Sequence, residues 1–357
     1  MYKILIMICL IHMFQQTEVA LSQETESADS KKFYSFTLDG NIPEALKLAS
    51  SDGVSLKQDV RDEFLKRFGG DKDQSEFLLQ KNSPVSDLLV IYRDYWRRAF
   101  FGGDTGGSDL KLGLTRFFNT KYAAGLRSDS TLNDDELDLF VKRYVNENGM
   151  HTTGFGMTGK FYDLLIWKNQ SDTTYHFSLN GKDISPKVVF MTDFVTLGWE
   201  EYATLGKYYP GGWATKEAIF CVKDAYDLGS ENFLVSYLAH EGQHFEDYKL
   251  FPELSSTDLE YRAKLVELAM ASRTLYRTIS FFISNADSSS TNPHSAANYF
   301  VIRDLSRALF RRDFISEAEQ WEGVPENIIN KESALLLESN TLELLSIGRE
   351  VKNYIRP

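Results

Sequence analysis

The sequence has little cysteine. Two cysteines occur in 357 residues, so a fold held together by disulfides is excluded. Cys9 lies in an apolar stretch near the N-terminus, which leaves Cys221 alone if that stretch is removed. Cys221 falls in the apolar run of residues 218–222. A small thiol in such a run is typical of a buried strand, so we interpret Cys221 as a packing residue and not as a nucleophile.

Basic residues are also scarce relative to acidic ones. The chain has 39 Lys and Arg against 51 Asp and Glu, a formal net charge of −12. Phosphate backbones are bound by basic surfaces, so the composition predicts no nucleic-acid partner. With 43% hydrophobic and 25% charged residues, the chain has the ordinary composition of a globular protein and is not disordered throughout. The composition leaves the oligomeric state unknown.

Long apolar runs are absent beyond the N-terminal region. The run from Ile4 to Phe14 follows Lys3 and precedes small residues around Ser22. This pattern predicts a secretory signal peptide over residues 1–22, with an uncleaved anchor as the alternative. The run is too short to cross a hydrocarbon layer of about 30 Å. We therefore expect a secreted or periplasmic protein, without stable membrane insertion after cleavage. Polar residues 23–32 predict a flexible leader.

Hydrophobic periodicity then divides the chain into helical and extended parts. Ser230 is a good N-cap for a helix that should end near Tyr248, and Asn180-Gly181 predicts a hairpin turn between strands. We expect an α+β fold, predominantly helical, with a small and mostly antiparallel sheet. The expected segments are a helical N-terminal region over 33–150, a sheet over 151–222, helices over 230–284 with the second running from about 257 to 283, and C-terminal helices over 295–354.

The decisive motif is His240-Glu241-Gly242-Gln243-His244. On a helix, side chains at i and i+4 share one face, so both imidazoles can bind one metal ion. Zinc accepts histidine nitrogens at about 2.0–2.1 Å. Glu241 lies about 100° around the helix from His240. It is therefore placed to take a proton from a metal-activated water without ligating the metal itself.

At this point the sequence resembles the zincin metallopeptidases, over residues 240–260 and more loosely over the strand and turn before them. The metzincin branch would have glycine at position 247 and histidine at position 250, whereas this chain has Asp247 and Leu250. The gluzincin branch takes a third zinc ligand, a glutamate, from the next helix. The resemblance therefore implies a zincin-like catalytic region over 151–357 that binds one Zn²⁺ ion.

For the third ligand the resemblance favours Glu260, with Glu267 as the alternative. The small Ala263 would allow two helices to pack closely, and Glu267 would then accept a hydrogen bond from a ligand histidine. Asp247 is a further supporting residue or else a solvated helix end.

Peptide hydrolysis also requires a donor to the developing oxyanion. We assign this role to His294, with Tyr261 and Tyr299 as rivals and a surface histidine as the plain alternative.

The resulting expectation is a zinc-dependent peptidase acting on a peptide or protein substrate, in which Glu241 is the general base. Two alternatives stay open. One is a secreted binding protein that retains a zincin fold without turnover. The other is a zinc hydrolase that acts on a bond other than a peptide.

Overall fold

The computed structural model describes residues 27–74, 83–122, 131–179, 181–290 and 292–355. The predicted signal peptide and the first residues of the predicted leader lie outside this range. The prediction of a flexible leader is wrong for its second half, because helix α1 (Ala28–Leu38) begins there. Ser27 caps this helix by accepting a hydrogen bond from the Ser30 amide at 3.1 Å. Phe33 is fully buried, and this burial fixes the segment against the helices that follow.

The chain folds into two compact units that do not follow each other along the sequence. Among the described residues, unit 1 contains the chain up to Gln170 together with Met191–Pro210. Unit 2 contains Ser171–Phe190 and everything from Gly211 onward. The predicted domain boundary after residue 150 is therefore wrong. The reason is that two long strands, β4 (Leu165–Thr174) and β7 (Lys187–Leu197), each contribute residues to both units.

Unit 1 is mainly helical, as predicted for residues 33–150. An aromatic core that includes Tyr92, Trp96 and Tyr202 joins its helices, and the aromatic stripe at helical spacing on α4 accounts for this packing. After α1 its helices are α2 (Ile42–Ser50), α3 (Gln58–Phe68), α4 (Ser86–Phe100), α5 (Ser108–Tyr122), α6 (Asp134–Glu147) and the short α7 (Trp199–Ala203). Its short strands are β1 (His151–Thr152), β2 (Gly156–Thr158) and β3 (Phe161–Asp163).

The largest sheet has five strands in the order β1-β4-β7-β9-β8. Within unit 2, β8 (Gly212–Ala214) pairs antiparallel with β9 (Ile219–Val222). A separate hairpin joins β5 (Phe177–Leu179) to β6 (Lys182–Ile184). Gly181 in its turn has a φ of +79°, which a hairpin turn requires and glycine adopts easily. The hairpin predicted at Asn180-Gly181 is therefore confirmed, although residue 180 lies outside the described part.

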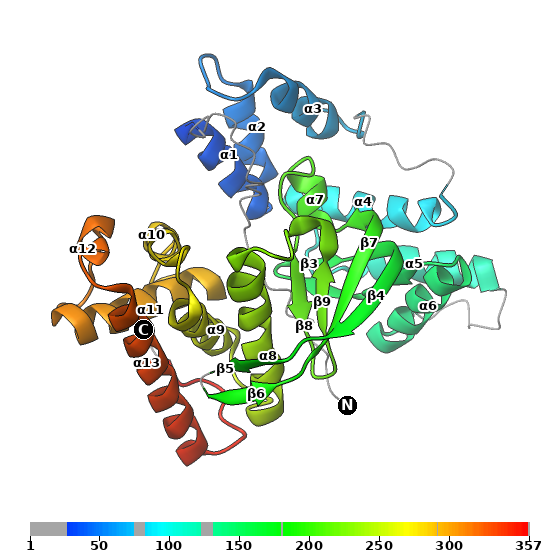
Figure 1. The fold of residues 1–357 in the computed structure, drawn as a ribbon. Helices are drawn as coiled ribbons and strands as arrows, with labels where there is room; N and C mark the ends of the chain where they lie inside the picture. The colour runs from blue at the N-terminus through cyan, green and yellow to red at the C-terminus, as the bar shows by residue number, and fades with distance from the viewer. Residues whose placement is uncertain (1–26, 75–82, 123–130, 180, 291, 356–357) are drawn as a thin grey trace. The chain divides into compact units, whose positions relative to one another are not determined.

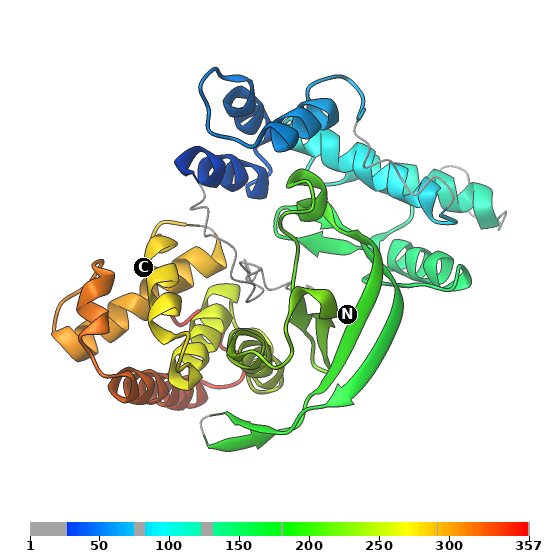
Figure 2. The same cartoon turned by 45° about the horizontal axis from the view of Figure 1, so that its top comes forward.

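The C-terminal half of unit 2 is a group of helices (Figures 1 and 2). They are a π-helical turn η2 (Asn232–Ala239), α8 (His240–Leu250), α9 (Ser256–Met270), α10 (Leu275–Ser284), α11 (Pro293–Phe310), α12 (Ala318–Glu322) and α13 (Glu326–Ile347). Helix α9 packs against α8, α11 and α13. Most of its residues are buried, so α9 is the central helix of this group.

The single helix predicted from about 257 to 283 is wrong, because the chain breaks between α9 and α10. The Glu231 carboxylate accepts hydrogen bonds from the backbone amides of Ser272, Arg273 and Thr274 at 2.6, 3.0 and 3.1 Å. These amides are donors that a continuous helix would pair with its own carbonyls. Here the Glu231 carboxylate, 41 residues earlier in the chain, accepts from these amides in place of the helix carbonyls. A new helix, α10, then begins.

The fold class is thus α+β, predominantly helical with a small mixed sheet. Within the described ranges, no helix combines the length and the apolar character that crossing a membrane requires.

Candidate metal centre

Helix α8 carries the histidine motif into the interior of unit 2. The predicted cap is present, because Ser230 Oγ accepts a hydrogen bond from the Phe233 amide at 3.1 Å. The π-helical turn then gives way to α-helix at His240, and departures of this kind from α-helical geometry are frequent at functional sites. Phe233 and Tyr237 are fully buried and hold the preceding turn against the sheet. As a result both motif histidines are only 1% exposed.

Three side chains from α8 and α9 converge at one point. The Nε2 atoms of His240 and His244 are 3.1 Å apart. Glu260 Oε2 lies 3.5 Å from the first of them and Glu260 Oε1 lies 3.3 Å from the second. A ligand atom from each of these residues falls within 4.8 Å of the others, and no other group of this kind is found in the described ranges. Of the two glutamates considered as third ligand, Glu260 belongs to this group, and the choice between them stays a prediction.

The separations are short enough for the three side chains to share one ion. Ligand atoms about 2.0–2.1 Å from a central zinc lie about 3.3–3.4 Å from one another along the edges of a tetrahedron. The two Nε2 atoms lie 3.1 Å apart, and each lies 3.3–3.5 Å from a different Glu260 oxygen, so the carboxylate faces the point between the two rings. Two imidazoles and a carboxylate are also the donor set of many catalytic zinc sites. The residues present therefore fit a single divalent cation.

Glu267 occupies the supporting position expected from the sequence. Its Oε1 lies 2.6 Å from His240 Nδ1, the ring nitrogen that faces away from Glu260 and His244. Burial alone would lower the pKa of His240, but the carboxylates of Glu267 and Glu260 outweigh it and raise that pKa to about 10. A carboxylate on the outer nitrogen fixes the ring orientation, which leaves Nε2 to face the centre.

Glu260, the candidate third ligand, lies against three histidines at once. Burial by itself would raise the pKa of Glu260, but His294 and the two motif histidines reverse this effect and hold it well below the usual range. Ala263, one turn further along α9, is completely buried. The small side chain expected between packed helices is therefore in place, with α8 directly against α9.

His294 joins the cluster from the first turn of α11. Its Nδ1 lies 2.9 Å from Glu260 Oε2, and its side chain is 18% exposed. The alternative of a surface histidine is therefore wrong. Asn292 caps α11 by accepting a hydrogen bond from the His294 amide at 2.9 Å, which places the imidazole at the helix start.

The two tyrosine rivals of His294 are occupied elsewhere. Tyr261 donates its hydroxyl to Asp304 at 3.0 Å, and Tyr299 stacks on Phe314.

Glu241, the predicted general base, is fully buried one residue from His240. Glu241 influences one titratable group on β9 and one on η2. Burial raises the pKa of the Cys221 thiol to about 12 and that of the Tyr237 hydroxyl well above its usual range, and Glu241 adds to both effects. Cys221 is completely buried, as predicted for a strand cysteine.

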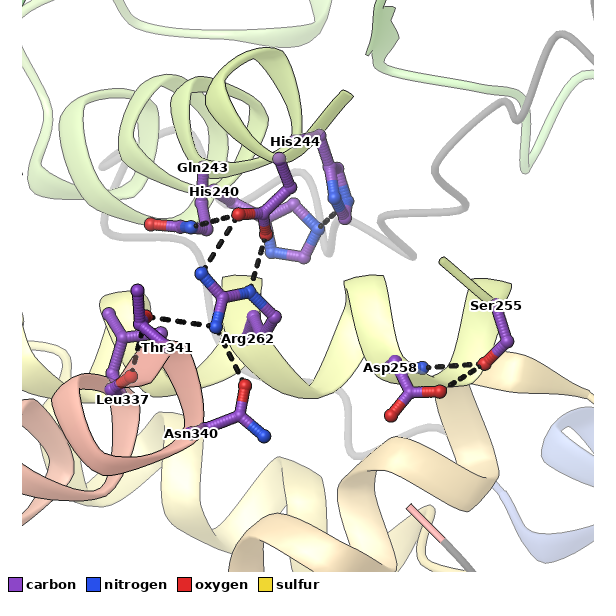
Figure 3. A network of polar contacts seen from close by, with 10 residues as sticks. His240, Gln243, His244, Ser255, Asp258, Arg262, Leu337, Asn340 and Thr341 are labelled. Atoms are coloured by element: carbon purple, nitrogen blue, oxygen red, sulfur yellow. Dashed lines mark hydrogen bonds and ion pairs between the residues drawn. The ribbon is translucent and has the colours of Figure 1, made fainter. Parts of the chain in front are cut away.

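Sequence reasoning missed the ion pair that joins the two helices of the candidate centre. Arg262 of α9 donates Nε and Nη2 to the two carboxylate oxygens of Asp247 on α8, at 2.8 and 2.9 Å. Its Nη1 donates to Asn340 and Thr341 of α13 at 2.7 and 3.0 Å. Figure 3 shows Arg262 between these helices, beneath the motif histidines. Asp247 is thus buried in an ion pair between helices and is not a solvated helix end. No local pattern links positions 247 and 262, so nothing in the sequence alone indicates this pair.

Packing explains why the motif carries a glycine at position 242. A Cβ atom at this position would lie 2.8 Å from Phe177 Cζ and 3.1 Å from Ile184 Cδ1. The hairpin of β5 and β6 therefore rests directly on the backbone of α8, and only glycine leaves room for it.

Comparison with known proteins yields no relative. No protein family model matches the chain, and no curated protein or solved structure resembles it closely enough to match. The site is therefore interpreted from its own chemistry.

Proposed function

We propose that the protein is a zinc-dependent peptidase of the gluzincin type, with His240, His244 and Glu260 as metal ligands. The observation that carries the proposal is the convergence of the two imidazole Nε2 atoms and the Glu260 carboxylate at 3.1–3.5 Å in a buried position. Such a zinc ion would supply a Lewis acid that polarises a carbonyl and acidifies water.

In this proposal the side chains around the ligands have separate tasks. Glu241 accepts a proton and returns it to the leaving amine. Glu267 holds the His240 ring through Nδ1. His294, which contacts Glu260 and is partly exposed, donates a hydrogen bond to the oxyanion that develops on the substrate.

An edge strand beside the motif helix supports a peptide substrate. Strand β8 is the last strand of the five-stranded sheet, and it packs next to α8. An extended chain can add to such an edge by backbone hydrogen bonding, which is independent of substrate side chains.

Gly211, the residue before this strand, does not itself make room for a substrate. A Cβ atom on Gly211 would meet the Tyr226 hydroxyl at 2.4 Å, so that space is already filled.

The proposal is tested by metal analysis of the purified protein, followed by cleavage of a peptide library. The wild type is compared with Glu241→Gln and with Glu253→Gln, an exposed glutamate outside the site. We expect about one zinc per chain, cleavage by the wild type and by Glu253→Gln, and loss of cleavage in Glu241→Gln with zinc retained.

The other outcomes separate the alternatives. Bound zinc without cleavage of any peptide would support a binding protein that retains the site. Zinc-dependent hydrolysis restricted to esters or glycans would support a hydrolase of another bond. Protein that neither contains nor takes up a divalent ion would overturn the proposal.

A further inference from the structure

The outward face of α13 presents a row of apolar side chains. Ile328, Leu335 and Leu342 are spaced seven residues apart and are 42%, 44% and 62% exposed. Seven residues fall about 20° short of two full turns, so these three side chains form a nearly straight stripe along the helix. The opposite face of α13, with Ile329, Ser333, Leu337, Asn340 and Leu344, is buried. The stripe is therefore a second apolar face of a helix whose first face already packs in unit 2.

The charged residues beside the stripe lie on one flank. Lys331 is one turn before Leu335, Glu338 is about one turn after it, and both are exposed. On a helical wheel centred on Leu335, Lys331 and Glu338 fall about 40° and 60° to the same side. The other flank carries Glu332 and Ser339. One flank of the stripe thus carries a basic group, Lys331, on the N-terminal side of Leu335 and an acidic group, Glu338, on its C-terminal side.

This arrangement is complementary to itself under a two-fold rotation. If two copies of α13 pair antiparallel about Leu335, Ile328 of one copy faces Leu342 of the other. The same flank of both helices then meets. The two-fold axis passes at Leu335, with Lys331 four residues before it and Glu338 three residues after it. Lys331 of one copy and Glu338 of the other therefore differ in height along the helices by only about 1.5 Å. Each pairing is made twice, as the symmetry of an isologous dimer requires.

We propose that α13 is a homodimer contact, with a second copy of this chain paired antiparallel along Ile328, Leu335 and Leu342. Removing three large aliphatic side chains per copy from water supplies the attraction. The two Lys331–Glu338 pairs fix the direction and the register. A pair of single helices forms an interface at the small end of the stable range, so the dimer dissociates on dilution. This inference does not depend on the proposed enzymatic activity.

Sedimentation velocity of the full chain over a dilution series tests the proposal. The wild type should show a monomer–dimer equilibrium, and Leu335→Glu should be monomeric throughout. Leu139→Glu is the matched control, because Leu139 is an exposed leucine on α6 at 68% exposure, and it should dimerise like the wild type. Circular dichroism of Leu335→Glu should be unchanged, since its side chain lies on the outer face.

The charge pair tests the direction of the helices. Lys331→Glu should weaken the dimer on the order of tenfold, because two attractive pairs become repulsive. The double variant Lys331→Glu with Glu338→Lys should restore the wild-type dissociation constant. In a parallel pair the substituted residue would face Glu332 of the other copy, so Glu338→Lys would not rescue it. A wild type that stays monomeric, a dimer that persists in Leu335→Glu, or a double variant without rescue would each overturn the proposal.

Discussion

Arg262 holds both carboxylate oxygens of Asp247 in a bidentate ion pair that is buried between α8 and α9. Gln243, inside the histidine motif, donates to the same carboxylate at 2.8 Å. The pair therefore connects the helix with two of the candidate ligands to the helix with the third. Because Arg262 also reaches α13, one side chain fixes the spacing of three helices.

Replacing Arg262 with methionine should be strongly destabilising, because it leaves the Asp247 charge buried without its partner. The expected loss is about 3–5 kcal/mol. The double variant Asp247→Leu with Arg262→Met removes both charges and should be more stable than Arg262→Met alone. Hydrogen exchange of peptides from α8 and α9 measures the effect locally. As a control, Arg143→Met on α6 removes an exposed ion pair with Glu147 and a cation–π contact with Tyr122, and it should leave exchange of α8 and α9 unchanged. Additive losses in the double variant would contradict this account.

Glu267→Gln should weaken zinc binding about 10–100-fold if the proposed centre binds zinc. The amide oxygen can still accept a hydrogen bond from His240, but the negative charge that makes the imidazole a better donor to the metal is lost. Competition with a chromogenic chelator gives the dissociation constant. Glu253→Gln, which changes an exposed glutamate, should bind as the wild type does. Equal affinities in the wild type and Glu267→Gln would show that the 2.6 Å contact does not support the metal.

Asp163 should make unit 1 less stable as the pH rises. Burial raises its pKa from 3.8 to about 6 despite hydrogen bonds from the amides of Trp199 and Leu164. The folded state therefore favours the protonated form. Well below pH 3.8 the Asp163 carboxyl is protonated in both the folded and the unfolded state, and it costs no stability. Between pH 4 and 6 the unfolded state ionises first, and the loss reaches about 3 kcal/mol above pH 6.

The pH effect is measured by hydrogen exchange of peptides around Asp163 at pH 4.5 and pH 7.5. The variant Asp163→Asn keeps an oxygen for the Trp199 amide but cannot ionise, so its exchange should depend less on pH. Glu200, also buried, has a pKa raised well above its usual range by burial and by Asp163. Ionisation of Glu200 also lowers the stability of the folded state, but at higher pH. The stability of Asp163→Asn should therefore still fall with rising pH, although less than that of the wild type. A slope identical to that of the wild type would contradict the assignment to Asp163.

The Cys221 thiol should be inert in the folded protein. It is fully buried, and burial raises its pKa to about 12, so almost no thiolate is present near neutral pH. In a Cys9→Ser background, a thiol reagent should label Cys221 only after addition of denaturant, with a rate that follows unfolding. Rapid labelling under native conditions would mean that β9 opens far more often than its packing suggests.

Some features of the site depend only on local geometry, and the sequence predicted those. The spacing of His240 and His244 places both on one helical face whatever the rest of the chain does. Ser230 is a local cap, and Asn180-Gly181 is a local turn signal. The coarse fold class followed from the same kind of periodicity. Glu260 and Glu267 were proposed as third ligand and supporting residue through the resemblance to gluzincins, and both carboxylates lie against the motif histidines.

The remaining features were decided by contacts between distant parts of the chain. Glu231 ends the predicted long helix because its carboxylate takes over the amides of residues 272–274. Arg262 meets Asp247 only because α9 packs against α8. His294 reaches Glu260 across 34 residues of sequence. Helical periodicity indicates which face of each helix is apolar, but the partner of that face is set by packing in three dimensions. Tertiary structure therefore supplied these contacts, and local spacing supplied the histidine pair that they surround.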